Sequence, residues 1–476
     1  MGEVVEKVLR PFRVSRFDID STIKNSSFVV IAGAGLTGEA AKKYFTKRGL
    51  KTYVVVDSKS TKASGDSSVS LISDIESDIR AETGRGFSLF SPGISPSGSL
   101  AQKIFSLDLP SMSELDLLCE FAGEPLVGIT GTNGKSTTTT LVSEMLSASN
   151  LVQELIGNIG VPFIDALNRE ERGRRAFISE ISSYQLEWAE RISPKVGVIL
   201  NLAPNHLERH LTMEEYFHCK LKLIGTLDKN SYAILNSDDP NLLKIESAAP
   251  GRILWFGTKA KGEEYSKLSK DGNSLEVSCK FGDFTFDLSK TPLLGIHNKM
   301  NFAASIPASL IAGATVQGIN QVISSFRGLE HRLEHVPNKK NLRIINDSKA
   351  TTATATATDL KGVIDSTKDQ PITLLVGGLM KIGSWSGLFD EISKTDRVKK
   401  VLFFGKDGQQ IMEQLDGLSA PRAYHGTISD TLKIALEQSE QNEIILFSPG
   451  CPSFDAYSGF EERGRHFKSL VQELAA

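Results

Sequence analysis

The stretch that decides the fold of this chain is Gly128-Ile129-Thr130-Gly131-Thr132-Asn133-Gly134-Lys135-Ser136-Thr137. It follows an apolar run, Leu126–Thr130, and precedes a helical pattern over Ser136–Ser147. A glycine-rich turn between a strand and a helix brings backbone N–H groups close to phosphate oxygens at the helix N-terminus. In such a loop a lysine placed like Lys135 reaches the β and γ phosphates, and a hydroxyl placed like Ser136 holds Mg²⁺. The stretch therefore predicts a nucleoside triphosphate site, because a turn that served packing alone would not need this lysine and hydroxyl.

Apolar runs and helical patterns alternate on both sides of this loop. The other predicted strands are Phe28–Ala32, Thr52–Val56, Ala176–Glu180, Val196–Leu200, Ile372–Val376, Val401–Phe404 and Ile444–Phe447. The helical patterns between them include Gly38–Arg48, Glu214–Leu227 and Ile428–Gln438. Strands separated by helices of this length indicate an α/β protein with parallel, doubly wound sheets.

The length of 476 residues and three separate clusters of motifs predict three α/β domains, since a domain usually has about 100–200 residues. Breaks in the pattern near Ser111–Asp116 and Arg327–Leu329 give the predicted boundaries. We expect a Rossmann-like N-terminal domain (residues 1–115), a central domain with a parallel sheet of the P-loop ATPase type (116–329) and a Rossmann-like C-terminal domain (330–476).

Three segments depart from the simple alternation of strand and helix. Residues alternate at period two between Ser274 and Phe286, which predicts a small antiparallel excursion. The Thr/Ala run Ala350–Thr358 follows a strand and is compatible with the start of a helix. The serine-rich stretch Ser58–Ser73 is expected to be a surface connection.

The composition excludes several classes of protein. A hydrophobic content of 40% supplies enough apolar surface for packed cores, so neither disorder nor a fibrous repeat is expected. A net charge of −3, from 54 basic and 57 acidic residues, gives no electrostatic basis for binding nucleic acid or a membrane surface. No run of about 18 apolar residues is present, so no membrane span is expected.

Cysteine usage and the N-terminal sequence indicate the compartment. The four cysteines lie far apart without a C-x-x-C pair, which fits neither a disulfide framework nor a zinc knuckle; they are Cys119, Cys219, Cys279 and Cys451. The basic residues near the N-terminus are interleaved with acidic ones and lack the apolar segment of a signal peptide. We therefore expect a soluble, cytoplasmic protein.

A second glycine-rich turn, Gly33-Ala34-Gly35-Leu36-Thr37-Gly38, follows the first predicted strand, and Asp57 ends the next one. This arrangement is typical of a dinucleotide site, with pyrophosphate at the helix N-terminus and an acid on the ribose. Taken alone it is weak evidence for NAD, and a glycine turn that serves only packing is the alternative.

The glycine spacing of the phosphate loop departs from the general pattern. Glycines stand at positions 128, 131 and 134, and Ile129 occupies the place of the usual first glycine. This variant resembles the ATP loop of the Mur ligase and folylpolyglutamate synthase superfamily, whose members form amide bonds using ATP. The later motifs that match in order are Ser179–Leu186, Asn201–Leu207, Tyr216–Lys220, His297–Ala304, His331-Arg332, Asn346–Thr351 and Ser448–Asp455. The resemblance covers the chain from about residue 28 to its end.

Two of these motifs resemble the members of the superfamily that add D-glutamate. They are Asn346–Thr351, and Ser448–Asp455 with the following Phe460 and Arg463-Gly464. The resemblance implies a ligase that joins D-glutamate to UDP-N-acetylmuramoyl-L-alanine in peptidoglycan synthesis, through an acyl phosphate and a tetrahedral intermediate. It implies ATP, two Mg²⁺ ions and a carbamylated lysine, Lys220, as cofactors. We expect a cytoplasmic monomer that takes small-molecule substrates and binds no nucleic acid.

The resemblance also implies roles for individual residues. The catalytic residues would be Lys135, Glu180, His206 and Lys220, and the metal ligands Ser136, Glu180, His206 and carbamylated Lys220. The ATP site would comprise Gly131, Thr132, Asn133, Gly134, Lys135, Ser136, Thr137, Asn298, Asn301, Arg332, Asp347 and Lys349. The UDP-substrate site would comprise Gly35, Leu36, Thr37, Asp57, Ser58, Ser91, Pro92, Gly93, Asn158, Ser182 and Gln185. The D-glutamate site would comprise Thr351, Lys381, Ser453, Phe454 and Phe460.

Two of the implied metal ligands are chemically unusual. Magnesium prefers oxygen donors, so the role of His206 rests on the resemblance alone. A lysine ammonium cannot bind a metal ion, but a neutral amine reacts with carbon dioxide to give a carbamate with two oxygens of the type that magnesium favours. Nearby cations would stabilise this anion. The resemblance at Tyr216–Lys220 places the modified lysine at Lys220 rather than at Lys222.

Several other functions remain open from the sequence. Another Mur ligase, or a ligase like folylpolyglutamate synthase, would share the central domain, although the latter would be expected to lack Gly33–Gly38 with Asp57. An NAD dehydrogenase would explain the first glycine turn and leave the phosphate loop without a use. A non-catalytic nucleotide-binding protein would not need Glu180, His206 and Lys220 together.

Overall fold

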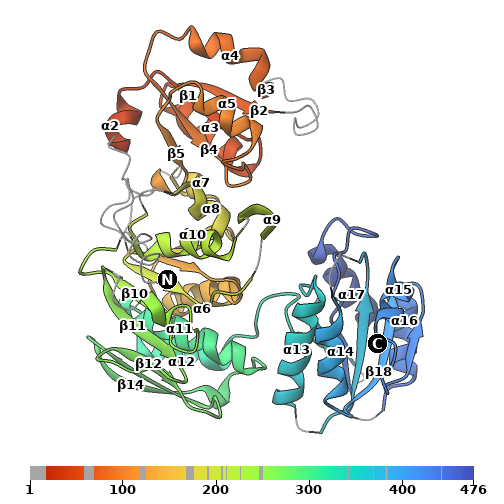
Figure 1. The fold of residues 1–476 in the computed structure, drawn as a ribbon. Helices are drawn as coiled ribbons and strands as arrows, with labels where there is room; N and C mark the ends of the chain where they lie inside the picture. The colour runs from red at the N-terminus through yellow and green to blue at the C-terminus, as the bar shows by residue number, and fades with distance from the viewer. Residues whose placement is uncertain are drawn as a thin grey trace. The chain divides into compact units, whose positions relative to one another are not determined.

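The computed structural model contains three β-sheets, each flanked by helices (Figure 1). The residues described are 18–57, 69–117, 125–167, 176–189, 192–204, 207–210, 212–225, 227–245, 250–339, 342–367, 369–380, 384–440 and 442–475. The chain divides into two compact units, Met1–Lys290 with Met300–Ser324, and Thr291–Lys299 with Ser325–Ala476. The first two sheets lie in the first unit and the third sheet in the second.

The first sheet has five parallel strands in the order β3-β2-β1-β4-β5. Its strands are β1 Phe28–Ala32, β2 Lys51–Val56, β3 Val69–Leu71, β4 Gly86–Phe90 and β5 Ser111–Ser113. Its helices are α2 Ile19–Lys24, α3 Leu36–Lys47, α4 Ile72–Arg80 and α5 Ser99–Phe105. The strand order reverses between β1 and β4, and in such sheets ligands bind where the loops after these two strands separate. Those loops are Gly33–Gly35 and Ser91–Gly98.

The second sheet has nine strands in the order β14-β13-β12-β11-β10-β9-β6-β8-β7. The strands are β6 Leu126–Thr130, β7 Gln153–Gly157, β8 Ala176–Glu180, β9 Val196–Ile199, β10 Tyr232–Asn236, β11 Arg252–Gly257, β12 Tyr265–Leu268, β13 Ser274–Cys279 and β14 Gly282–Asp287. Only β12, β13 and β14 pair antiparallel among the described strands of this sheet. Because β6 lies between β8 and β9, the residues that follow these three parallel strands meet at one edge of the sheet.

Among the residues described, seven helices follow strands of the second sheet. They are α6 Lys135–Ala148, α7 Phe163–Leu167, α8 Ser183–Trp188, α9 Leu207–His210, α10 Met213–Gly225, α11 Ile296–Ala312 and α12 Val316–Ser325, with short 3-10 turns at Leu243–Ile245 and Leu288–Lys290. Helix α6 begins directly after the phosphate loop, so the loop joins β6, an interior strand of the sheet, to a helix of 14 residues.

The third sheet has six strands in the order β15-β16-β20-β17-β18-β19. The strands are β15 Glu334–Val336, β16 Arg343–Asn346, β17 Ile372–Gly377, β18 Val398–Phe404, β19 Arg422–Tyr424 and β20 Ile444–Phe447. Its helices are α13 Ala353–Ser366, α14 Ser386–Ser393, α15 Gly408–Gln414, α16 Ile428–Glu437 and α17 Phe460–Leu474. Strand β15 is antiparallel to β16, and the other pairs are parallel.

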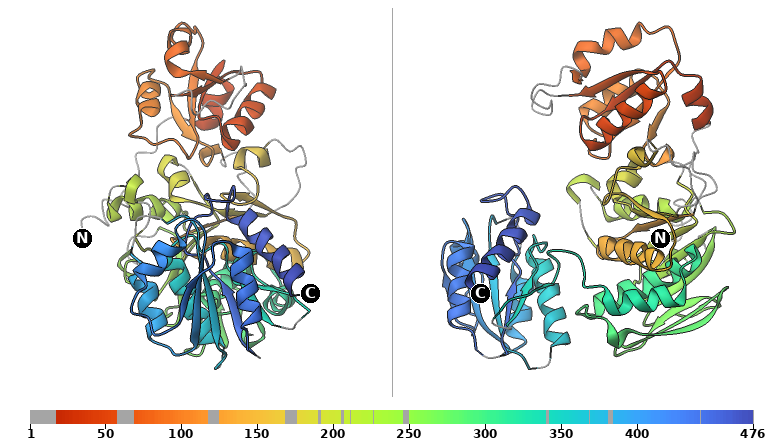
Figure 2. Two further views of the ribbon diagram at one scale, coloured as in Figure 1. Left: turned by 90° about the vertical axis from the view of Figure 1, so that its right-hand side faces the viewer. Right: turned by 180° about the vertical axis from the view of Figure 1, so that it is seen from behind.

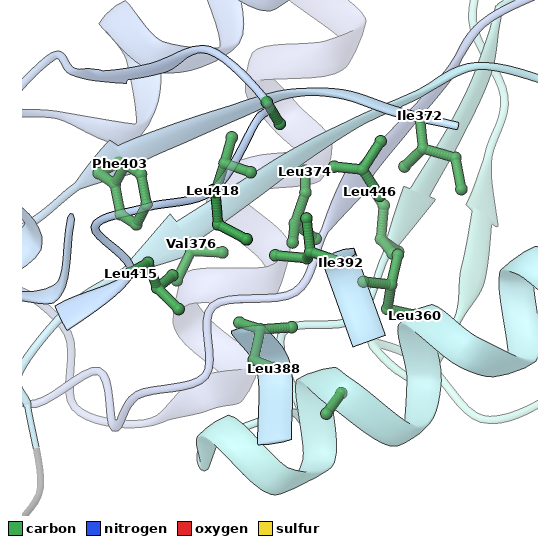
Figure 3. Close-up of a cluster of buried hydrophobic side chains, with 14 of the residues drawn as sticks. Leu360, Ile372, Leu374, Val376, Leu388, Ile392, Phe403, Leu415, Leu418 and Leu446 are labelled. Carbon is green, nitrogen blue, oxygen red and sulfur yellow. The ribbon is translucent and has the colours of Figure 1, made fainter. Parts of the chain in front are cut away.

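Helices cover both faces of the third sheet (Figure 2). They do so because both faces carry buried apolar side chains. On one face Leu374 and Leu446 pack with Leu360 of α13 and Leu388 of α14 (Figure 3). The opposite face packs against α16 and α17. Strands buried on both faces read as continuous apolar runs, which is how the sequence predicts them.

The structure confirms the α/β class and every strand that the sequence predicts. The antiparallel excursion is present as β13 and β14, and α13 begins within the Thr/Ala run at Ala353. The prediction for Ser58–Ser73 is wrong at its C-terminal end, where β3 pairs with β2 and α4 begins. Val69 and Ile72 are buried there and pack into the cores on the first sheet. The rest of the stretch, residues 58–68, lies outside the described residues. Within the part of the chain that the structure describes, no helix is both long and apolar enough to cross a membrane.

Candidate functional site

The phosphate loop has the backbone conformation that its glycines allow. Gly131 has a φ of +151° and Gly134 a φ of +84°, both in the region that side chains disfavour. A Cβ atom at Gly134 would lie 2.5 Å from Oδ1 of Asn301, so there is also no room for a side chain. Gly134 is the N-cap of α6 and offers no side-chain cap. An anion is therefore the natural partner of this helix N-terminus.

Asn201, which follows β9, holds the loop in place. Its Oδ1 accepts a hydrogen bond from the N–H of Asn133 at 2.8 Å, and its Nδ2 donates to the carbonyl of Asn133 at 3.1 Å. Its own carbonyl accepts from the N–H of Thr132 at 3.0 Å. The motif Asn201–Leu207 begins at Asn201, but the sequence assigned this residue no role. Its position directly after the predicted strand Val196–Leu200 is the signal that could have identified it as a residue of the site.

Two lysine side chains lie at the loop. The Nζ atom of Lys135 donates to the carbonyls of Gly131 and Thr132 at 3.1 and 3.0 Å. The Nζ atom of Lys220, on α10, donates to the same Gly131 carbonyl at 2.9 Å and to Oγ1 of Thr130 at 3.3 Å. The structure thus brings two predicted catalytic residues, 85 positions apart in the chain, to one carbonyl oxygen.

Lys220 is buried, with 1% of its surface exposed. Its pKa is lowered to about 7, first by burial and then by the positive charge of Lys135, against the opposing effects of Cys219 and Glu180. The neutral amine is therefore a major species near neutral pH. Lys222 lies elsewhere, with its ammonium bonded to the carbonyls of residues 187 and 189.

Glu180 ends β8, next to the loop, and is 2% exposed. Its Oε1 accepts a hydrogen bond from Nδ2 of Asn158 at 2.8 Å. Its Oε2 is buried and has no hydrogen-bond partner among the described residues. Because buried polar atoms are rarely left unpaired, this oxygen is suited to a ligand. A carboxylate oxygen beside a phosphate loop is the donor that Mg²⁺ prefers, so the residues present fit a magnesium ion.

Asn298 and Asn301, which the resemblance assigns to the nucleotide, both lie on α11 and are both buried. Oδ1 of Asn301 accepts from the hydroxyl of Thr138 at 3.3 Å, which links α11 to α6 just beyond the loop. Asn298 belongs to the second unit, where its Nδ2 donates to the carbonyl of Leu294 at 2.7 Å.

Six of the residues predicted to bind the UDP substrate, Gly35–Thr37 and Ser91–Gly93, follow β1 and β4, between which the strand order of the first sheet reverses. Gly35 is the N-cap of α3 and offers no side-chain cap, and Leu36 is 77% exposed. Oγ of Ser91 is buried without a hydrogen-bond partner among the described residues. Asp57 accepts a hydrogen bond from Ser99 at 3.0 Å. A buried free hydroxyl beside a helix N-terminus is a suitable site for a polar ligand.

Glu114, which sequence reasoning missed, joins residues of this predicted site. Its carboxylate accepts hydrogen bonds from Oγ1 of Thr37 at 3.4 Å and from Nε2 of Gln185 at 3.3 Å. Oε1 of Gln185 in turn accepts from the N–H and the hydroxyl of Ser182. Burial raises the pKa of Glu114 to about 7, although its hydrogen bonds lower it.

The second unit brings together several residues predicted for ATP and D-glutamate. Asp347 is fully buried and accepts a hydrogen bond from Ser448 at 2.7 Å; burial and the neighbouring carboxylate of Asp359 raise its pKa. The ammonium of Lys349 lies 3.9 Å from the centroid of the Phe460 ring.

The D-glutamate residues differ in exposure. Ser453 is buried and Phe454 is 69% exposed, and Thr351 is half-buried. Arg463 is buried and donates to the hydroxyl and the carbonyl of Ser348 and to the carbonyl of Cys451. Three predicted site residues, Ser58, His206 and Lys381, lie outside the described residues.

Comparison with known proteins places this fold and site in a class. Residues 129–309 match the family model of the Mur ligase middle domain. The MurF ligase of Thermotoga maritima in complex with ADP is similar in structure, with a TM-score of 0.59, 17% identity and 98% of each chain covered. A pseudomurein peptide ligase type C from Methanothermus fervidus has a TM-score of 0.56 at 16% identity, over 94% of this chain and 100% of the other. The chain therefore has the fold of the Mur ligases.

The curated relatives narrow the class further. The UDP-N-acetylmuramoylalanine–D-glutamate ligase of Syntrophus aciditrophicus is 30% identical over 465 residues, 94% of this chain and 98% of its own. The enzyme of the same name from Elusimicrobium minutum is 32% identical over 93% of this chain and 97% of its own. The chain belongs to the family of UDP-N-acetylmuramoylalanine–D-glutamate ligases.

Proposed function

We propose that this chain uses ATP to join D-glutamate to UDP-N-acetylmuramoyl-L-alanine, in the cytoplasm and as a monomer. The proposal rests on what lies together at one edge of the second sheet. Three features follow neighbouring strands there: a phosphate loop, the buried amine of Lys220 and an unpaired carboxylate oxygen of Glu180. The family to which the chain belongs supports the choice of substrates.

The reaction explains why a phosphate loop is needed. A carboxylate is a poor electrophile, and forming an amide from it is uphill in water. Transfer of the γ-phosphoryl group of ATP converts the substrate carboxylate into an acyl phosphate with a good leaving group. The amine of D-glutamate then attacks the acyl carbon, and the resulting tetrahedral intermediate expels phosphate. The chain's part is to orient the phosphates and neutralise their charge, and Lys135 and the N–H groups of the loop suit this role.

Four side chains are proposed to hold magnesium. Glu180 would use its unpaired Oε2, and Ser136 its hydroxyl at the start of α6. His206 and carbamylated Lys220 complete the proposed set. Bound Mg²⁺ would neutralise charge on the phosphates.

The surroundings of Lys220 support its modification. Carbamate formation joins the neutral lysine nitrogen to the carbon of CO₂ and releases one proton, which leaves an anion with two oxygens. A pKa of about 7 supplies the neutral amine near neutral pH, and Lys135 would stabilise the anionic product. Replacing a buried cation by an anion would also remove the repulsion between Lys220 and Lys135.

The remaining roles follow the three proposed domains, residues 1–115, 116–329 and 330–476. The first would bind the UDP part of the substrate through Gly35–Thr37, Asp57, Ser58 and Ser91–Gly93, with Asn158, Ser182 and Gln185 contributed by the central domain. The third would bind D-glutamate through Thr351, Lys381, Ser453, Phe454 and Phe460. The adenosine part of ATP would contact Asn298, Asn301, Arg332, Asp347 and Lys349.

Omission of single components tests the proposal. The purified chain is incubated with ATP, Mg²⁺, UDP-N-acetylmuramoyl-L-alanine and D-glutamate, and the product is detected by mass spectrometry. We expect a product joined to one glutamate, and none when any component is left out. Equal product formation with a folate substrate, or with L-alanine and UDP-N-acetylmuramate, would assign the chain to another ligase of the superfamily.

A further inference from the structure

One arginine contacts three successive carbonyl groups of the loop that follows β4. Nη2 of Arg209 donates to the carbonyl of Pro92 at 3.2 Å and to that of Ile94 at 2.6 Å. Nη1 donates to the carbonyl of Gly93 at 3.2 Å. Arg209 lies on α9, which follows the second sheet, whereas the loop belongs to the first sheet. Both lie in the first compact unit.

The other side of the guanidinium is fixed by the helix α8. Oε2 of Glu187 accepts hydrogen bonds from Nε at 2.9 Å and from Nη2 at 2.6 Å. The guanidinium also lies 4.8 Å from the centroid of the Tyr184 ring. The side chains of Arg209 and Glu187 are only 12% and 16% exposed. Removing one partner of so shielded a pair leaves an uncompensated charge, unlike the loss of a surface salt bridge.

Trp188, the neighbour of Glu187, holds the same loop by a second contact. Its Nε1 donates to the carbonyl of Ile94 at 2.8 Å. Its ring stacks on Phe90, the last residue of β4, with centroids 4.0 Å apart and an angle of 6° between the planes. The segment from Phe90 to Ile94 is therefore held at both ends by residues of the second sheet's helices.

The loop so held carries an unused hydroxyl. Oγ of Ser91 is buried and unpaired among the described residues. It would lie 3.1 Å from a Cβ atom at Gly33, so Ser91 packs against the glycine turn that opens α3. With the carbonyls of Pro92, Gly93 and Ile94 turned toward Arg209, the position of Ser91 beside this turn is fixed.

We infer that Arg209 is a positioning residue: it fixes loop 91–94 against the first glycine turn, so that the UDP part of the substrate finds a preformed site. This inference rests on the proposed function. An arginine suits the role because its planar fork of five N–H donors reaches several acceptors at once, whereas a lysine ammonium is a single point charge. Preorganisation of a loop raises affinity because less ordering is left to occur on binding.

Direct binding measurements test the inference without turnover. Calorimetry gives the Kd of UDP-N-acetylmuramoyl-L-alanine in the absence of ATP, and separately the Kd of ADP, for the wild type, Arg209→Lys, Arg209→Met and Glu187→Gln. We expect the Kd of the UDP substrate to rise about tenfold in the arginine variants and to rise also in Glu187→Gln, and the Kd of ADP to stay within about twofold in all three. In turnover, the KM for the UDP substrate should rise while kcat stays within about threefold.

Arg252→Lys is the control, at an arginine whose side chain is more exposed, 47% against 12% for Arg209. Arg252 also pairs with a glutamate, Glu264 at 3.1 Å, and also lies over a tyrosine ring, that of Tyr232 at 5.3 Å, but it touches no residue of loop 91–94. Its replacement should leave the Kd of the UDP substrate unchanged.

The outcomes separate the two claims. Wild-type affinity for the UDP substrate in a folded Arg209→Lys chain, or an equal loss of ADP affinity, would overturn the inference and leave the proposed function standing. If Arg209→Met does not fold, the Kd values of Arg209→Lys and Glu187→Gln test the inference. Failure of the wild type itself to bind the UDP substrate would contradict the proposed function and the inference together.

Discussion

The Nζ atom of Lys220 lies 2.9 Å from the carbonyl oxygen of Gly131, the glycine at which the phosphate loop leaves β6. A second lysine, Lys135, donates to the same oxygen at 3.1 Å. Two ammonium groups around one carbonyl repel each other, and burial disfavours the charge on Lys220 in particular. Of the two lysines, Lys220 is therefore the one that we expect to lose its positive charge in the active enzyme.

Replacing Lys220 should show whether its carbamate is needed. We expect Lys220→Ala to lower kcat at least about a hundredfold and formate or acetate to restore part of it by supplying carboxylate oxygens. Lys222→Ala, on the same helix, is the control and should keep kcat within about threefold. With ¹³C-bicarbonate, the wild type should give a carbamate signal in ¹³C NMR that grows from pH 6 to 8, as the amine loses its proton about pH 7. Full activity of Lys220→Ala, or no such signal in the active wild type, would contradict the proposal.

The role of Lys135 can be separated from substrate binding. Lys135→Ala should lower kcat at least about a hundredfold, because the charge that orients the phosphates is lost. The Kd of the UDP substrate should stay near the wild-type value, since most of the residues proposed to bind UDP follow strands of the first sheet. Calorimetry and phosphate release measure the two effects. A folded Lys135→Ala chain with normal turnover would show that this loop does not handle ATP.

Glu114 should make stability depend on pH near neutrality. Its pKa of about 7 in the folded chain lies above the ordinary 4.5, so the fold favours the protonated carboxyl. The stability it contributes is fully present below pH 4.5 and is lost as the pH rises through 7, by on the order of 3 kcal/mol. Glu114→Gln removes this titration, so its melting temperature relative to the wild type should be higher at pH 8 than at pH 5.5. If the variant and the wild type differ in melting temperature by the same amount at both pH values, Glu114 is ionised in the folded chain.

Much of the fold could be predicted because buried parallel strands are continuous apolar runs followed by glycines, as in Leu126–Thr130. Strand β4, Gly86–Phe90, is less evident because it opens with a glycine that packs on the Phe28 ring and contains a buried serine. The phosphate loop, Glu180 and Lys220 were predictable from local motifs, and the family assignment is confirmed. Their roles remain predictions.

The residues to which the sequence assigned no individual role act between distant segments. Arg463 donates to Ser348, 115 positions away, and Arg209 to Gly93, 116 positions away. Glu114 joins Thr37 to Gln185 across separations of 77 and 71 positions. No periodicity or spacing in the sequence records such pairs, because they depend on how the sheets bring loops together.

Oxygen-18 tests the proposed intermediate. With the carboxylate of UDP-N-acetylmuramoyl-L-alanine labelled, one labelled oxygen should leave with the released phosphate, because it bridges carbon and phosphorus in the acyl phosphate. Mass spectrometry of the phosphate measures this transfer. Retention of both labelled oxygens outside the phosphate would exclude phosphorylation of the carboxylate.

The comparison of the two glutamate enantiomers tests the central claim most directly. Phosphate release is followed with ATP, Mg²⁺ and UDP-N-acetylmuramoyl-L-alanine, with D-glutamate or L-glutamate added at equal concentration. The proposed function predicts sustained release with D-glutamate and almost none with L-glutamate or without the UDP substrate. Equal turnover of the two enantiomers, or release that does not need the UDP substrate, would contradict it.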